Sequence, residues 1–239
     1  MTENRLFKTE SHTDRSFDEQ LQAVNSQIIL MGEQVVKLLE IARKSLEKPS
    51  KKLVEESKSE DRKLNALDFD VQQKATKIIA LRQPLGVDLR FIIAVLKISS
   101  SLERMGDLAK SSCKKASRFH NLISEEINSD LHEINALATK MVNDTMNAYR
   151  DMDAAKANYV LGQDDEVDDL YHKLLDDVKE HARINPDLIP AFGDIIFAAK
   201  NMERIGDHCT KLADLVHYIA SGEHVGKVAN QKKQFEDKE

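Results

Sequence analysis

Leu102-Glu103-Arg104-Met105-Gly106-Asp107 recurs 100 residues later as Met202-Glu203-Arg204-Ile205-Gly206-Asp207. The two segments are identical at the Glu, Arg, Gly and Asp positions. Each lies in a run of apolar and small residues spaced alternately by three and four, which is the spacing of a helix packed in a bundle. The glycine of each segment falls within this spacing, where the lack of a side chain lets two helices approach closely. We therefore predict that one long helix occurs twice in the chain and carries the same acidic motif both times.

Two further helices repeat in the same way. An apolar seam over residues 21–42 recurs over residues 131–152, and the helix that contains Asp61 has a counterpart that contains Asp164. The offset between the copies falls from 110 to 103 and then 100 residues, as expected if the second copy has lost about two helical turns from its first hairpin and a few residues from its second. The sequence thus predicts an all-α fold of six long helices, built as two tandem three-helix bundles related by an internal pseudo-twofold repeat.

The limits of the two units follow from the seams. We predict one three-helix bundle over residues 16–122 and the other over residues 123–225. Gln83-Pro84 should end the second helix, because proline cannot continue one. The flanking segments, residues 1–15 and 226–239, are polar and carry no seam, so we expect them to be disordered.

Composition narrows the classes of function. The 239 residues carry a formal net charge of -6 without an isolated basic block. Such a chain is poorly suited to nonspecific nucleic-acid binding, which depends on Lys and Arg neutralising phosphates. No stretch approaches the ~18 apolar residues of a membrane-spanning helix, and two cysteines cannot form a disulfide framework. We expect a cytoplasmic protein that binds no nucleic acid and is peripheral at the inner membrane only through partners.

The doubled motif also points to a candidate site. Glu103 and Asp107 lie four residues apart, as do Glu203 and Asp207, so each pair shares one helical face. Like charges at that spacing destabilise a helix, so a cation should offset them, either an arginine or a metal ion. The neighbouring helices offer further carboxylates, namely Asp61, Asp68, Asp164, Asp165, Asp168 and Asp169. Clustered oxygen ligands suit iron, zinc, manganese or magnesium, whereas the alternative is a set of solvated surface charges.

Further motifs accompany the doubled segment. In the first copy they are Leu81-Arg82-Gln83-Pro84, Asp88-Leu89-Arg90 and Leu96-Lys97, and in the second Asp165-Glu166-Val167-Asp168-Asp169-Leu170-Tyr171 and Asn201 through His208. With these motifs the chain resembles the PhoU family, the phosphate-signalling regulators of bacteria. The resemblance runs from about Phe17 to Val225.

The resemblance implies a function as well as a fold. It implies a homodimeric, non-enzymatic accessory protein of the high-affinity phosphate ABC transporter. Such a protein restrains phosphate uptake and connects the transporter, through its ATPase subunit, to a membrane sensor histidine kinase. In this way it keeps the phosphate-starvation regulon repressed when phosphate is plentiful.

The resemblance also implies metal ligands. Some members bind multinuclear iron or zinc clusters through motifs that correspond here to Glu103, Asp107, Glu203 and Asp207. Asp168 is the best candidate for a ligand from a neighbouring helix. Its counterpart in the first copy is Asn65, which is not an acid. This departure argues against two identical clusters and favours the second site.

Two alternatives stay open at this point. Helices with paired acids can hold two irons, as in ferritin-like oxidases and storage proteins, but that chemistry draws Glu-x-x-His from two helices. The nearest imitation here is Asp169-x-x-His172. The other alternative is an accessory protein of a different phosphate permease. The absence of a nucleophile-and-base set or a Gly-rich phosphate loop favours a regulator over an enzyme.

Overall fold

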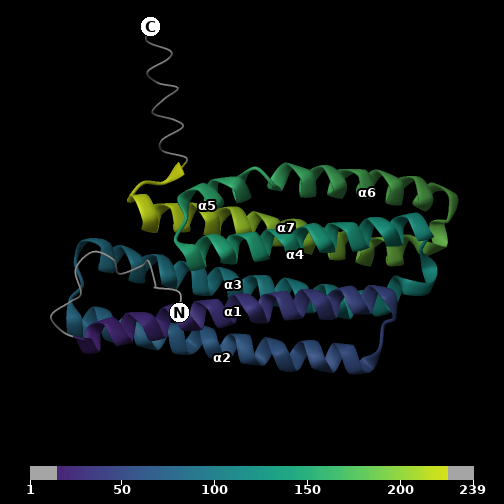
Figure 1. Ribbon diagram of the computed structural model, residues 1–239. Coiled ribbons are helices and arrows are strands. Elements are labelled where there is room, and N and C mark those ends of the chain that lie inside the picture. Colours follow the sequence, from purple (N-terminus) through teal and green to yellow (C-terminus); the bar gives the residue numbers. More distant parts are fainter. Residues whose placement is uncertain (1–14, 226–239) are drawn as a thin grey trace, which may run out of the picture.

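A computed structural model describes residues 15–225 of the chain, and they form an all-α molecule of two helical units (Figure 1). The first unit consists of α1 (Arg15–Glu47), α2 (Lys51–Arg82) and α3 (Gly86–Phe119). The second consists of α4 (Glu125–Asp151), α5 (Ala154–Leu161), α6 (Asp164–Ile184) and α7 (Ile189–Ser221). Short 3₁₀ turns at His120–Leu122 and Pro186–Leu188 precede α4 and α7. The disorder expected for the two ends of the chain concerns residues that, apart from Arg15, lie outside the described part.

The repeated seams form the hydrophobic core, as predicted. Along α1 the seam residues are fully buried, and so are most of their counterparts along α4: Leu21, Val24, Ile28, Met31, Val35 and Leu38 in α1, and Ile134, Ala138, Thr145 and Ala148 in α4. Burying one stripe of each helix supplies the packing energy that helices of this length need, since helix propensity alone is a small contribution.

The helix ends show why the chain turns where it does. Ser50 caps α2 by accepting a hydrogen bond from the backbone N–H of Leu53 at 3.2 Å. At its other end the backbone turns left-handed at Gln83, with φ 48°, directly before Pro84, so the predicted helix end is confirmed. Gly222 ends α7 in the same conformation, with φ 86°, which glycine adopts without strain.

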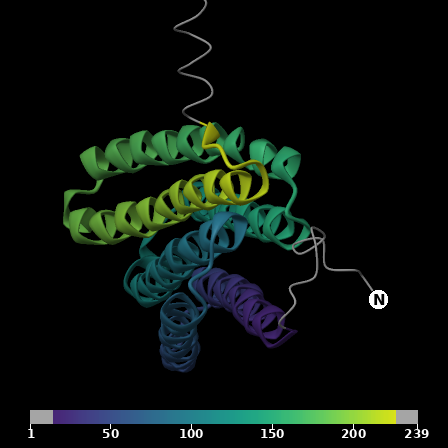
Figure 2. The ribbon, with the colours of Figure 1, turned by 90° about the vertical axis from the view of Figure 1, so that its left-hand side faces the viewer.

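The two units pack through their third helices. Figure 2 shows the two units stacked on each other, with α3 and α7 at the contact, and α1 also packs against α4. α3 and α7 run antiparallel, because Arg90 near the start of α3 lies 5.8 Å from the ring of Tyr218 near the end of α7. At the other end Lys115 Nζ lies 2.8 Å from Asp194 Oδ1. Among the described residues, no helix is long and apolar enough to cross a membrane.

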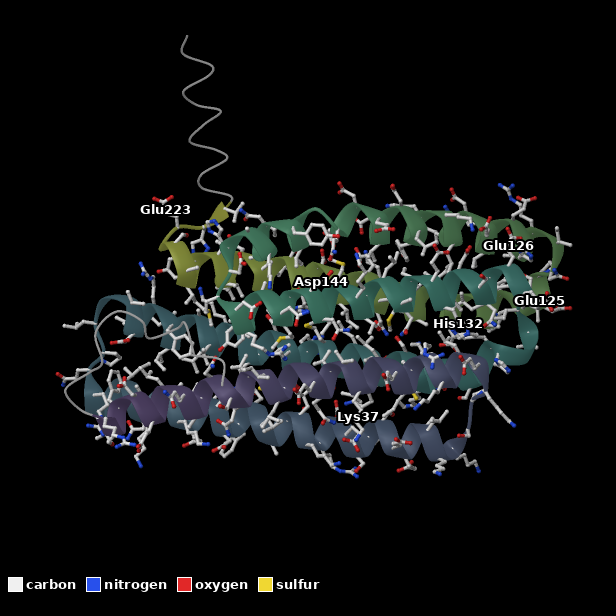
Figure 3. The ribbon with its side chains drawn as sticks, in the orientation of Figure 1. Lys37, Glu125, Glu126, His132, Asp144 and Glu223 are labelled. Atoms are coloured by element: carbon white, nitrogen blue, oxygen red, sulfur yellow. The ribbon has the colours of Figure 1, made fainter. Side chains whose placement is uncertain are left out.

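The second helix of the second unit differs from its counterpart. α2 is continuous, whereas the corresponding stretch is divided at Gly162 and Gln163 into α5 and α6. The side chain of Gln163 is buried and donates a hydrogen bond to Asp144 Oδ2 of α4 at 2.8 Å, and Asp144 is labelled in Figure 3. The break makes Asp164 the first residue of α6.

Candidate functional site

The acidic motifs of α3 and α7 each face carboxylates from the helix before them in the chain. We call the group formed by Glu103 and Asp107 of α3 with Asp61 and Asp68 of α2 the first cluster. The second cluster consists of Glu203 and Asp207 of α7 with Asp164 and Asp168 of α6. The five predicted metal ligands, including Asp168, therefore lie in one of the two clusters, whereas the candidate acids Asp165 and Asp169 are exposed outside them.

The first cluster contains its own cation. Lys110 of α3 places its Nζ 2.7 Å from Asp61 Oδ2 and 2.6 Å from Asp107 Oδ1, so it joins α2 to α3. Burial opposes the charge of Lys110, but the hydrogen bonds to both carboxylates outweigh it and raise the pKa of the amino group. The lysine is therefore protonated at any physiological pH and offsets part of the negative charge. Arg104 adds a weaker, exposed contact to Asp107 at 3.7 Å.

The negative charge that Lys110 does not offset acts on Glu103. Partial burial raises its pKa, and the three aspartates of the cluster raise it further. Asp68 receives a hydrogen bond from the hydroxyl of Ser99.

The second cluster lacks an equivalent of Lys110. Thr210 stands at the corresponding position of α7, and its hydroxyl donates to the backbone carbonyl of Asp207 at 2.9 Å. Within residues 15–225, no Lys, Arg or His forms an ion pair with Asp164, Asp168 or Asp207. Burial is the first cause that raises the pKa of Asp164 to about 6, and the other carboxylates of the cluster, together with Asp165, add to it.

Glu203 is the most deeply buried acid of the second cluster. It is 9% exposed, and its Oε1 accepts a hydrogen bond from Lys200 Nζ at 2.5 Å. Its Oε2 is buried and has no hydrogen-bond partner within the described part of the chain. A buried carboxylate oxygen without a donor is costly, and a cation at this position would relieve that cost.

The two motif glycines make room for different groups. A Cβ at position 206 would lie 3.1 Å from Asp164 Oδ1, so Gly206 lets a carboxylate of α6 approach the backbone of α7. A Cβ at position 106 would lie only 2.2 Å from Cδ2 of Leu64, so Gly106 instead admits an apolar side chain of α2. The same residue therefore serves core packing in one unit and carboxylate placement in the other.

These observations bear on whether a metal fits. Within residues 15–225, no three side chains of His, Cys, Asp or Glu are arranged so that they could hold a metal ion. The second cluster nevertheless offers suitable donors, because it has four carboxylates and the unpartnered Oε2 of Glu203. In the first cluster the ammonium of Lys110 stands between two of the carboxylates. Metal ligation by the predicted residues stays a prediction.

The sequence alone did not single out Asp164 or point to Lys110. Asp164 was only one of four candidate acids of its helix, yet its charge interacts with every other member of the second cluster. Its alignment with Asp61 was the signal that could have singled it out. For Lys110 the signal was its place three residues after the motif aspartate, where the other copy has Thr210.

Comparison with known proteins gives a consistent result. A family model described as the PhoU domain matches the chain twice, over residues 28–116 and 131–216. The phosphate-specific transport system accessory protein PhoU homolog of Zymomonas mobilis is 34% identical over 214 residues, which cover 90% of each chain. The phosphate-specific transport system accessory protein PhoU of Escherichia coli is 26% identical over 218 residues, also 90% of each chain.

Solved structures agree with the fold. The crystal structure of PhoU from Pseudomonas aeruginosa superposes with a TM-score of 0.82 at 30% identity, covering 87% of this chain and 100% of that one. The phosphate transport system regulatory protein PhoU from Streptococcus pneumoniae gives a TM-score of 0.78 at 25% identity, covering 87% and 99%. The two family matches fall one in each helical unit, in agreement with the internal repeat.

Proposed function

The chain belongs to the PhoU family of phosphate transport accessory proteins, and on that premise we propose that it is a non-enzymatic negative regulator of phosphate uptake. In this proposal it connects the ATPase subunit of a phosphate ABC transporter to a sensor histidine kinase and keeps the phosphate-starvation regulon repressed. It acts as a homodimer and reaches the membrane only through these partners. The observation that carries the proposal is the match of both helical units to the same regulatory family.

Exposed apolar side chains at both ends of the molecule support a role in docking. Leu81 and Leu85, which is 80% exposed, flank the connection between α2 and α3. Ile184, which is 71% exposed, and Ile189 flank the connection between α6 and α7. Figure 1 shows these connections at opposite ends of the long helices. Apolar groups gathered at an exposed loop are a common feature of protein–protein contacts, and two such ends suit a protein with two partners.

A reporter assay tests the regulatory role. Alkaline-phosphatase activity, as a reporter of the starvation response, is measured in phosphate-replete cells that lack the gene and in cells complemented with it. We expect high activity without the gene and low activity after complementation. Unchanged repression in the deletion strain would contradict the proposal and favour an accessory role at a different permease.

The same assay tests the docking ends. Complementation with Leu81→Glu and Leu85→Glu together should fail to restore repression, because two charges replace the apolar contact. The matched control is Leu30→Glu, a half-exposed position in the middle of α1, which should complement normally. Equal complementation by both variants would show that the α2–α3 end makes no required contact.

We further propose that the second cluster binds a divalent metal ion, with iron or zinc as the first candidates and manganese or magnesium as alternatives. Glu203 and Asp207 of α7 and Asp164 and Asp168 of α6 are the proposed ligands. A bound ion would add positive charge between the carboxylates of α6 and α7, beside the ion pair that Lys200 forms with Glu203. What supports the proposal is the unpartnered Oε2 of Glu203.

Metal content tests this second proposal. Glu203→Ala with Asp207→Ala should lower the metal content of the purified protein while the helical circular dichroism signal is kept. The control is Asp176→Ala with Glu180→Ala, two exposed acids of α6 outside the cluster, which should leave the metal content unchanged. Equal metal content in all three proteins would refute the site.

A further inference from the structure

The contact between α3 and α7 has two ends, and different residues occupy them. At the end where α7 begins, Lys115 Nζ lies 4.5 Å from the centre of the Phe197 ring and 2.8 Å from Asp194 Oδ1. One hundred residues earlier, α3 has Lys97 in place of Phe197 and Ala94 in place of Asp194. The other end of the contact therefore has a lysine at the position of the aromatic ring, and alanine at the position of the acid.

A cavity of about 590 Å³ lies at that other end, between α3, α5, α7 and the turn that follows α7. Lys97 lines it from α3 and Lys211 lines it from α7. Both lysines are exposed, and neither forms an ion pair within residues 15–225. Lys97 also belongs to the Leu96-Lys97 motif, to which the proposed regulatory role assigns no task. Two ammonium groups, one from each helical unit, are thus directed to one cavity.

The rest of the lining is mainly apolar. Leu161 of α5, Leu215 of α7 and Val225 of the turn supply the apolar surface, and Ser101 and Thr210 add two hydroxyl groups. The hydroxyl of Ser101 makes no hydrogen bond to any other residue of the described chain. An apolar surface beside a few polar groups is typical of sites for small organic molecules. Here the polar groups favour a ligand with an anionic head and an apolar body.

One acid, Asp214, also lines the cavity, and the turn after α7 engages it. Its Oδ2 accepts a hydrogen bond from His224 Nδ1 at 2.6 Å, and its Oδ1 accepts one from the backbone N–H of Val225 at 2.8 Å. The ring of His224 stacks on Tyr218 of α7 with a centroid distance of 4.4 Å. Glu223, labelled in Figure 3, belongs to the same turn. These contacts fix the turn as a wall of the cavity and give both oxygens of Asp214 a donor other than the two lysines.

We propose that this cavity binds a small phosphate monoester, with the phosphate between Lys97 and Lys211 and the organic part against Leu161 and Leu215. A phosphate monoester carries a charge of about −1.5 to −2 at pH 7, which matches two ammonium groups, and lysine is a common phosphate ligand. The volume is within the range of small-molecule sites and leaves room for an organic part beside the phosphate. The inference rests neither on the proposed regulatory function nor on the proposed metal site.

Naphthyl phosphate is the probe that tests the site, because it joins a phosphate group to an apolar body. Its binding to the full chain is measured by isothermal titration calorimetry. We expect saturable binding of about one molecule per chain. Naphthol, which lacks the phosphate, and inorganic phosphate, which lacks the apolar body, should each bind at least about tenfold more weakly.

Substitution of the two lysines locates the binding. Lys97→Gln and Lys211→Gln should each weaken binding of naphthyl phosphate by about tenfold, because each removes one charged contact. Lys114→Gln, which removes an exposed lysine of α3 outside the cavity, is the matched control and should bind like the unchanged chain. All three side chains are exposed, so the variants should keep the helical circular dichroism signal.

Three results would overturn the inference. The first is the absence of saturable binding of naphthyl phosphate to the unchanged chain. The second is equal affinity of the Lys97→Gln, Lys211→Gln and Lys114→Gln variants, which would place the probe elsewhere. The third is an affinity for naphthol or for inorganic phosphate as high as that for naphthyl phosphate, because one half of the ligand would then contribute nothing.

Discussion

Asp164 illustrates how a single side chain can be unfavourable for folding and suited to a site. Its pKa is raised to about 6, first by burial and then by its acidic neighbours, so its ionised form is destabilised in the folded protein. The folded state thus holds this proton more tightly than the unfolded state, and the stability contributed by Asp164 falls as pH rises from about 4 to about 6. Such strain at a cluster of like charges is typical of functional sites.

Replacing Asp164 should therefore stabilise the metal-free protein. At pH 7.5 and with EDTA present, Asp164→Asn should unfold at a higher urea concentration than the unchanged chain, because the unfavourable charge is gone. The gain should shrink towards pH 4.5, where Asp164 of the unchanged folded protein is already protonated. Urea titrations at both pH values measure this difference, and a loss of stability at pH 7.5 would contradict the electrostatic account.

The pKa of Glu60 is shifted in the opposite direction to that of Asp164. Burial disfavours its charge, but hydrogen bonds from Gln34, Lys63 and Lys37 outweigh it and lower the pKa to about 2. Lys37, labelled in Figure 3, belongs to α1. Its Nζ lies 3.1 Å from Glu60 Oε1, so these contacts connect α1 to α2. A lowered pKa stabilises the fold above the unfolded value near 4.5, and this stability is lost as pH falls from there to about 2.

Glu60→Gln should consequently cost about 2 kcal/mol at pH 7, since it removes charged hydrogen bonds from a buried group. The difference from the unchanged chain should narrow between pH 4.5 and pH 2. Chemical denaturation across that range provides the measurement. A difference that is constant with pH would mean that the charge of Glu60 is not what holds α1 to α2.

At the scale of the elements, the helices could be predicted from the spacing of apolar residues. It identified the repeated helices and their shared core because burial of one helical stripe decides where a long helix forms. The break between α5 and α6 was not predictable in the same way. Glycine is tolerated within helices, and the interruption is accompanied by a tertiary contact, the hydrogen bond from Gln163 to Asp144 of α4.

The contact between α2 and α3 depends on the missing side chain of Gly106. Gly106→Ala should destabilise the protein by about 1–3 kcal/mol, because the new methyl group would overlap Leu64 and force the two helices apart. Gly193→Ala in α7 is the control: a Cβ there meets nothing within 4 Å, so the change should be neutral or stabilise by up to about 1 kcal/mol. Thermal unfolding of both variants measures this difference in stability. Equal melting temperatures would refute the close packing of α2 on α3.

At the scale of the whole molecule, two copies of one sequence pattern have produced similar folds with different electrostatics. The sequence was sufficient for the all-α repeat and for the carboxylates of the doubled motif, since both follow from residue spacing. It did not reveal which charged residues interact most strongly, because Asp164 and Lys110 make their interactions with residues of neighbouring helices. A position that differs between internal repeats is therefore informative about function even when the fold is the same.

The most direct measurement is anomalous X-ray diffraction from crystals grown with Mn²⁺, recorded near the manganese absorption edge. The account predicts an anomalous peak between α6 and α7, beside the carboxylates of Glu203 and Asp164. No peak between α6 and α7 would contradict it.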